Sequence, residues 1–244
     1  MRRIRMTVRY DGTEYHGWQE QPGLATVQGT LVETLATLLG ERPLVEGAGR
    51  TDAGVHALGQ VASFQTEHRI EVGRLQAALN SRLPADIAVT EAAEAPPFFR
   101  PSRDAVAKHY RYRIYRGPIK PVFEERFVWH WHQPLEVEPM RGAARLLVGR
   151  HDFRSFETGG SPRGDTVREI FRFDVTEAGP ELYFDVEGDG FLYRMVRNLV
   201  GTLTEVGRGH RTPEWVTQVR KAKDRAAAGP CAPAKGLCLV EVRY

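Results

Sequence analysis

The decapeptide GAGRTDAGVH at residues 47–56 constrains this chain more than any other stretch. Glycines and alanines surround Arg50 and Asp52, so another backbone segment or a flat ring can approach them closely. If the segment is extended, both charged side chains point to the same side, because side chains alternate along a strand. A guanidinium beside a carboxylate favours the ionised acid, which suits a nucleophile or general base that works without a metal. The alternative is a solvated glycine-rich turn with a surface ion pair.

Length and composition limit the kinds of protein that this chain can be. The chain has 244 residues, enough for one large domain or two small ones, and its 41% apolar and 27% charged residues are typical of soluble globular proteins. No apolar run approaches the ~20 residues of a membrane span, and residues 1–12 lack the apolar core of a secretory signal. The two cysteines, Cys231 and Cys238, have no metal-binding or disulfide-framework spacing. These features predict a cytoplasmic protein without membrane contact.

Basic residues are mainly arginines, with 29 arginines against 5 lysines. Arginine clamps phosphates and stacks on bases, although a GC-rich genome produces the same bias. The segment 100–116 holds six Lys or Arg and one acid, Asp104, among aromatic residues, and this mixture suits a structured RNA. The alternative is a basic strand whose tyrosines belong to the core, which we favour for Tyr112 and Ile114. Periodicity leaves both interpretations open for Tyr110.

Hydrophobic periodicity predicts two halves, residues 1–100 and 101–244, joined by the proline-rich stretch 95–101. Each half is predicted as strand–helix–strand–helix–strand, and alternation with hairpin turns favours a largely antiparallel sheet with helices on one face, an α+β fold. The predicted strands are 4–10, 59–66, one from 87, 108–115, 167–176, 181–187 and 237–242. Helices are predicted after Thr26, across 72–79, between Pro139 and Gly149, after Phe191 and after Pro213. Residues 116–138 and 153–163 are predicted as loops.

GRTDAGVHA resembles the signature of the tRNA pseudouridine synthase A family. Four more blocks resemble the family's in the same order, and together the five span nearly the whole chain: YDGTEYHGWQEQP, KHYRYRIY, FLYRMVRNLVG and GLCLVEVRY. The resemblance implies the pseudouridine synthase fold, in which two α/β halves form a mainly antiparallel central sheet crossed by a basic cleft.

The resemblance also implies site residues. Asp52 matches the family's nucleophilic aspartate, and whether it attacks ribose C1′ or abstracts a proton there stays open. Arg50 is placed to fill the gap left by the flipped base. Tyr110 matches the tyrosine that stacks on the target base, and Arg197 matches the ion-pair partner of the aspartate. From spacing alone, Arg194, Arg197 and Gly201 share one helix face, and spacing alone favours an arginine there that lies along the surface with its stem buried.

The implied activity is isomerisation of uridine to pseudouridine at positions 38, 39 and 40 in the anticodon stem-loop of tRNA. No atoms enter or leave, so the resemblance implies no cofactor and no metal. It also implies a homodimer with one tRNA contacting both subunits.

Two departures from the family pattern and two rival functions accompany this interpretation. Cys238 stands where the family usually has tyrosine, and His109 where a basic residue is common. One rival is a catalytically silent RNA-binding protein. The other is a metal-dependent RNA hydrolase using Asp52 and His56, which we discount because Gly54 lies between them and no third ligand has a recognisable spacing.

Overall fold

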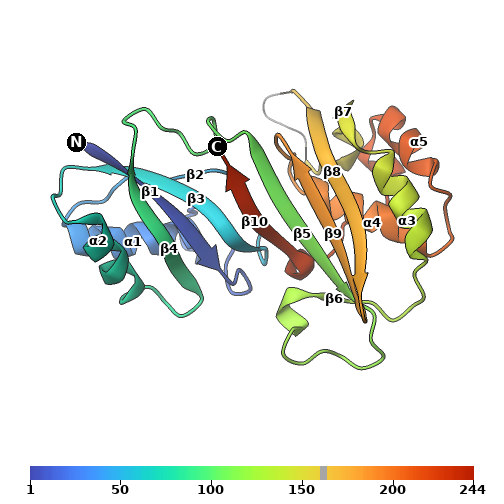
Figure 1. Ribbon diagram of the computed structural model, residues 1–244, viewed down its shortest axis with the longest axis horizontal. Helices are drawn as coiled ribbons and strands as arrows, with labels where there is room; N and C mark the ends of the chain where they lie inside the picture. Colours follow the sequence, from blue (N-terminus) through green and yellow to red (C-terminus); the bar gives the residue numbers. More distant parts are fainter. Residues whose placement is uncertain (160–163) are drawn as a thin grey trace. The chain divides into compact units, whose positions relative to one another are not determined.

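The computed structural model describes residues 1–159 and 164–244 (Figure 1). Contacts divide the chain into two compact units. Unit 1 comprises Met1–Val106 and Cys238–Tyr244, and unit 2 comprises Ala107–Leu237. The sequence suggests a boundary after residue 100, whereas the contacts group the last strand with the first unit.

Unit 1 is an α+β layer whose strands pair mainly antiparallel. β1 (Arg2–Tyr10) lies between β3 (His56–Thr66) and β4 (Ile87–Ala95) and is antiparallel to both. The two-residue β2 (Glu46–Gly47) pairs antiparallel with β3, and β10 (Leu237–Arg243) pairs with β3 in parallel. This unit follows the predicted strand–helix–strand–helix–strand order, with β2 inserted before the second long strand.

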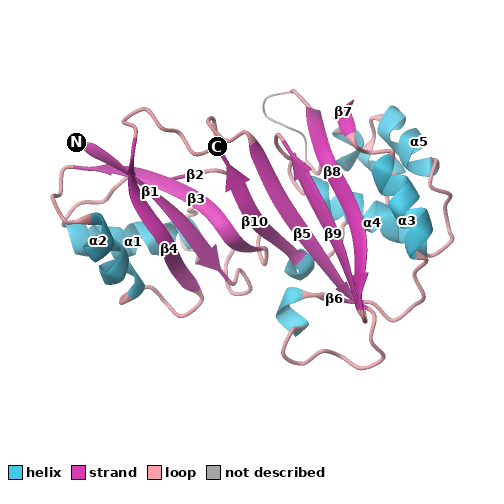
Figure 2. Ribbon diagram, in the orientation of Figure 1, coloured by secondary structure: helices cyan, strands magenta, loops and turns pink. Residues whose placement is uncertain are grey.

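The two helices of unit 1 lie on the same side of its strands (Figure 2). α1 (Val27–Leu39) begins after Thr26, whose hydroxyl accepts a backbone N–H of the first turn at 3.2 Å. It ends at Gly40, which has the left-handed φ of +71° that terminates many helices. α2 (Val72–Asn80) is similarly capped by the side chain of the residue before it. The apolar side of α1 is buried at Val27, Leu31, Leu35 and Leu39.

Unit 2 is a second α+β layer with an antiparallel sheet. β9 (Glu181–Gly188) lies between β5 (Ala107–Tyr115) and β8 (Val167–Ala178), and β7 (Gly149–Asp152) pairs with β8. The two-residue β6 (Trp129–His130) runs parallel to β5. The predicted hairpin between β8 and β9 is confirmed. The mainly antiparallel α+β class predicted from the sequence is therefore confirmed in both units.

Three helices complete unit 2: α3 (Val137–Arg145), α4 (Met195–Gly207) and α5 (Trp215–Ala222). α3 contacts both α4 and β8. The predicted limits of α3 are wrong at both ends. Pro139 is its third residue, which is tolerated because first-turn N–H groups have no intrahelical acceptor. The helix ends four residues before Gly149. No helix among residues 1–159 and 164–244 is long and apolar enough to cross a bilayer.

The predicted ranges of the second half have the observed order, and only the summary pattern strand–helix–strand–helix–strand fails. Among the described residues no α-helix lies between β7 and β8, β8 and β9 form a hairpin, and α4 and α5 follow each other directly. Antiparallel strands need only a two-residue turn, so no crossover helix is required between them.

The two predicted loops contain short regular pieces. The first, residues 116–138, holds a 3₁₀ turn at Glu125–Phe127, the strand β6 and the start of α3. The second holds a 3₁₀ turn at Arg154–Phe156. The last part of that predicted loop, residues 160–163, lies outside the described residues.

We expect Thr26→Ala to lower the free energy of unfolding by about 1 kcal/mol, because the first turn of α1 loses its side-chain acceptor. Thr26 is 2% exposed. Thr37 is exposed in the body of the same helix, so Thr37→Ala should be neutral or stabilise by up to about 0.5 kcal/mol. Urea denaturation of both variants measures the difference, and equal losses would contradict the capping role of Thr26.

Candidate active site

Residues 48–55 form the loop between β2 and β3 and carry Arg50 and Asp52. The loop ends in a turn, in which the Val55 N–H donates to the Asp52 carbonyl at 3.1 Å and Gly54 has φ +76°. Because the segment is not extended, strand alternation does not orient the two charged side chains. Arg50 is exposed and Asp52 is half-buried.

The 10–18 segment, which follows β1, holds the 48–55 loop through the main chain. The Trp18 N–H donates to the Thr51 carbonyl at 3.1 Å, and the Gly54 N–H donates to the Tyr15 carbonyl at 3.3 Å. The 10–18 segment is thus the donor in one bond and the acceptor in the other. They satisfy backbone groups on both sides of Asp52 that no strand or helix would pair.

Two buried side chains support the loop further. The Tyr10 hydroxyl lies 2.8 Å from Thr51 Oγ1, and the Gln60 side-chain amide donates to the Gly49 carbonyl at 2.8 Å. Burial raises the pKa of the Tyr10 phenol, so it stays protonated and able to donate. Loss of either support leaves a buried polar group without its partner.

Glycines make the close approach possible. A Cβ at Gly47 would lie 2.6 Å from the Trp18 indole ring, which is 1% exposed. Gly17 has φ +90°, and a Cβ there would lie 2.5 Å from the Thr51 carbonyl oxygen. The expectation that a flat ring and a second backbone approach the glycine-rich motif is therefore confirmed.

His56, the first residue of β3, has a structural role. Its Nδ1 accepts the Gly12 N–H at 3.0 Å and lies 3.2 Å from Asp11 Oδ1. The Gly12 N–H and the Asp11 carboxylate thus engage this ring nitrogen within unit 1. In the described parts of the chain, no three or more His, Cys, Asp or Glu side chains form a metal-binding group.

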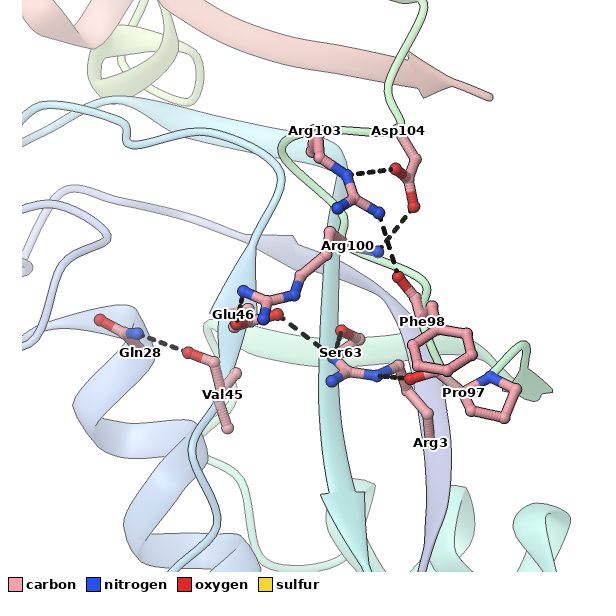
Figure 3. A network of polar contacts seen from close by, with 10 residues as sticks. All are labelled: Arg3, Gln28, Val45, Glu46, Ser63, Pro97, Phe98, Arg100, Arg103 and Asp104. Carbon is pink, nitrogen blue, oxygen red and sulfur yellow. Dashed lines mark hydrogen bonds and ion pairs between the residues drawn. The ribbon is translucent and has the colours of Figure 1, made fainter. Parts of the chain in front are cut away.

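A network of ion pairs fixes the start of the loop (Figure 3). Glu46, the first residue of β2, accepts from Arg3 at 3.2 Å and from Arg100 at 2.9 Å. Arg3 is 7% exposed and also donates to Ser63 Oγ on β3 at 3.0 Å. Arg100 comes from the stretch after β4, so three separate segments of unit 1 converge on the residue before Gly47.

Tyr110 lies on β5 in unit 2 and is 7% exposed. Its ring meets Phe191 edge-on, with centroids 5.1 Å apart. Tyr112 and Ile114, on the same face of the strand, are fully buried, which confirms their assignment to the core. Tyr110 therefore combines burial with an aromatic neighbour that fixes its ring, an arrangement compatible with packing and with base stacking.

Arg197 lies on α4, and its Nε donates to the Ala232 carbonyl at 2.8 Å. Gly201, one turn later, permits this contact, because a Cβ there would lie 1.7 Å from the Pro230 carbonyl oxygen. Arg194 does not share that helix face as predicted. It precedes the helix with φ +59°, an uncommon left-handed conformation for a residue with a side chain. The segment 230–232 therefore orients Arg197, whereas Arg194 lies outside this helix face.

The basic segment 100–116 is largely neutralised by acids that lie elsewhere in the sequence. Arg111 makes two hydrogen bonds to Asp185, at 2.9 and 3.2 Å, and Arg113 makes two to Glu181. Burial tends to raise the pKa of Asp185, but hydrogen bonds from His109 and Arg111 outweigh it and hold that pKa below its usual range. In the folded protein, carboxylates of the neighbouring strand thus balance most of the positive charge that this stretch of sequence carries.

The predicted site residues lie on two sets of elements. Arg50 and Asp52 share one loop of unit 1, while Tyr110 and Arg197 lie on β5 and α4 of unit 2, which contact each other. The resemblance places the 10–18 segment near the cleft but gave it no chemical role, although Gly12 and Gly17 in DGTEYHG were the available signal of a close backbone approach.

Comparison with known proteins places the chain in a family. Residues 6–102 and 143–244 match a family model described as tRNA pseudouridine synthase. The tRNA pseudouridine synthase A of Moorella thermoacetica is 50% identical over 99% of both chains. Its counterpart from Syntrophotalea carbinolica is 47% identical over 99% of this chain and 96% of that protein. The chain therefore belongs to the tRNA pseudouridine synthase family, a family of isomerases.

The matched segments include Arg50, Asp52 and Arg197, and Tyr110 lies between them. Among solved structures, an archaeal box H/ACA sRNP Nop10–Cbf5 complex matches at 12% identity and a TM-score of 0.38, covering 82% of this chain and 43% of that chain. That likeness is too distant to carry an argument.

We expect Gly17→Ala to destabilise unit 1 more than Gly23→Ala does. Both glycines have positive φ, at +90° and +73°, so each substitution costs about 1–2 kcal/mol in backbone strain. Only the Cβ at residue 17 meets the Thr51 carbonyl, which adds about 1–3 kcal/mol of overpacking. Urea denaturation of the two variants measures their free energies of unfolding. Equal losses would show that the 10–18 segment is not in close contact with the 48–55 loop.

Proposed function

We propose that this chain isomerises uridine to pseudouridine at positions 38, 39 and 40 in the anticodon arm of tRNA. The observation that carries the proposal is the 48–55 loop, which holds the half-buried Asp52 between backbone hydrogen bonds from the 10–18 segment. Membership of the tRNA pseudouridine synthase family supports the reaction type and the substrate class.

The reaction requires a fixed carboxylate. The bond between uracil N1 and ribose C1′ breaks, the base turns, C5 bonds to C1′, the hydrogen of C5 leaves as a proton, and N1 takes up a proton. All other atoms are retained, so the proposal includes no cofactor and no metal. Asp52 acts at C1′, either by forming a covalent adduct or by abstracting a proton, and both roles need the ionised form. A preorganised loop keeps that carboxylate in place without reorganisation during the reaction.

Arg197 and Arg50 have separate parts in the proposal. The hydrogen bond from Arg197 Nε to the Ala232 carbonyl orients the guanidinium, which in this proposal pairs with Asp52 and keeps it charged. Arg50 is exposed on the loop, so it fills the gap that the flipped uridine leaves in the stem. Flipping costs a few kcal/mol, which contacts to the RNA backbone offset.

Tyr110 stacks on the extracted uracil in this proposal. The edge-on contact with Phe191 fixes the plane of the tyrosine ring before the base arrives. A fixed ring loses little conformational freedom on binding.

The assembly is part of the same proposal. We infer a cytoplasmic homodimer in which one tRNA contacts both subunits, and light scattering of the purified protein in solution measures the subunit number. The rival metal-dependent hydrolase is disfavoured because His56 Nδ1 already accepts the Gly12 N–H. That rival predicts RNA cleavage that EDTA abolishes, whereas the isomerase is indifferent to EDTA. A catalytically silent RNA-binding protein predicts no turnover at all.

Asp52→Asn should lower single-turnover isomerisation by a factor on the order of 10⁴ or more, because the variant keeps the shape and loses the charge. Tritium release from tRNA labelled as [5-³H]uridine measures the reaction, since C5 must lose its hydrogen. Binding of tRNA should be largely retained. Asp174→Asn, at an exposed acid on β8, is the matched control and should keep normal turnover. Activity of Asp52→Asn within about tenfold of wild type would refute the assignment.

Tyr110→Phe separates the possible roles of the tyrosine. A hydroxyl that moves the proton at C5 predicts a folded variant that binds tRNA and loses roughly 10²–10⁴ in rate. Stacking alone predicts an active Tyr110→Phe and an inactive Tyr110→Ala, with a loss of about 1–3 kcal/mol of base contact. Single-turnover rates and melting temperatures of both variants decide. Lower melting temperatures with normal turnover would remove Tyr110 from the site.

A further inference from the structure

Lys108 differs from the arginines around it in the basic segment 100–116. Each of the five arginines forms an ion pair with a carboxylate: Arg100 with Glu46, Arg103 with Asp104, Arg111 with Asp185, Arg113 with Glu181, and Arg116 with Glu177. Lys108 is half-buried and forms no hydrogen bond or ion pair with any residue in the ranges 1–159 and 164–244. A half-buried cation without a partner calls for an explanation, because burial penalises its charge.

The sheet register places Arg168 on the same face as Lys108. Lys108 on β5 lies opposite Gly188 on β9, which lies opposite Ile170 on β8. Directly opposed residues share a face, and so do residues two apart on a strand, so Arg168 and Tyr110 also belong to this face. Arg111 and Arg113 lie on the other face.

Glycines separate the two cations. Gly188 and Gly190 carry no side chain between β5 and β8, and a Cβ at Gly190 would lie 3.6 Å from both Cδ and Nε of Arg168. The stem of Arg168 therefore lies over Gly190, and its charge acts on Lys108. Burial first, and Arg168 second, lower the pKa of Lys108.

Neighbouring carboxylates do not neutralise this pair closely. Asp189 opposes the shift in Lys108, but its Oδ1 accepts the Glu169 N–H at 2.9 Å. Asp165 lies 3.9 Å from the Arg168 guanidinium, at the outer limit of an ion pair, and its side chain is 69% exposed. Two cations thus repel each other on a partly desolvated surface, which is unfavourable until an anion lies between them.

The aromatic neighbours indicate which anion fits. Phe191 follows Gly190 directly and contacts the Tyr110 ring edge-on. Lys108 precedes Tyr110 by two residues on the same face, about 6.6–6.8 Å along the strand. A nucleotide whose base lies on Tyr110 therefore brings its own phosphate within reach of the lysine side chain.

We propose that Lys108 and Arg168 together bind a backbone phosphate of the RNA beside the nucleotide that contacts Tyr110. The inference rests on the proposed function through the place of Tyr110. A lysine ammonium binds phosphate as a point charge, and an arginine guanidinium binds it with two parallel N–H groups. The two side chains, on two different strands, therefore bind the same phosphate group.

The test compares Lys108→Met, Lys108→Arg and the matched control Lys221→Met, which removes the same charge from an exposed position on α5. The dissociation constant of unmodified tRNA is measured from low to physiological salt, together with the melting temperature of each free protein. Lys108→Met should weaken binding about tenfold at low salt and reduce the slope of log affinity against log salt by about 0.7–0.9. Its melting temperature should stay the same or rise, because the repulsion is relieved. Lys108→Arg should restore the slope, and Lys221→Met should match wild type.

Two results would overturn the proposal: an unchanged slope in Lys108→Met, whatever its melting temperature, or an equal loss of slope in Lys221→Met. If Lys108→Met does not fold, Lys108→Gln replaces it in the same comparison with Lys108→Arg. Tritium release by the wild-type protein tests the isomerase activity separately. An inactive wild type that still shows the Lys108 effect would refute the proposed reaction and leave the phosphate site standing.

Discussion

The backbone contact between the 10–18 segment and the 48–55 loop is the constraint on which the candidate site depends. An irregular loop can be half-buried only if its peptide groups find hydrogen-bond partners. Here the Thr51 carbonyl accepts the Trp18 N–H, and the Gly54 N–H donates to the Tyr15 carbonyl. Gly17 and Gly47 allow the two segments to approach this closely because they have no side chain. Buried Tyr10 on β1 and Gln60 on β3 also form hydrogen bonds with the loop. The conformation around Asp52 is thus imposed by its neighbours and not by local propensity.

Electrostatics in unit 2 follow a different rule, that of cross-strand pairing. Asp185 is 5% exposed, yet His109 and Arg111 from the adjacent strand hold its pKa below the usual range, so it is charged at neutral pH. This pairing cancels most of the positive charge of β5 on one sheet face. On the opposite face Lys108 has no close partner among residues 1–159 and 164–244, so the two faces of one strand differ in what they can attract.

Local signals in the sequence predicted much of the fold. Thr26 caps α1, and the turn at Gly179 joins β8 to β9, because caps and turns depend on a few adjacent residues. The motif and its resemblance identified Asp52 as the candidate catalytic group.

The failures concern long-range partners and backbone conformation. The acid that pairs with Arg111 is on another strand, Asp185, and single-sequence periodicity does not report it. The left-handed backbone at Arg194 is uncommon for a residue with a side chain, so the helix was expected to include it. The same holds for the 10–18 segment, whose contacts depend on tertiary structure alone.

The pairing of β10 with β3 has a consequence for the order in which the protein is made. Cys238 lies opposite His56, where the 48–55 loop passes into β3, so this strand edge stays open until residues 238–244 have left the ribosome. A nascent chain can form β1, β3 and β4 early, but it carries an unpaired edge beside its future site throughout the synthesis of unit 2. Closing that edge requires a strand that follows unit 2 in the sequence, so the support beside the 48–55 loop is completed only after unit 2 has been synthesised.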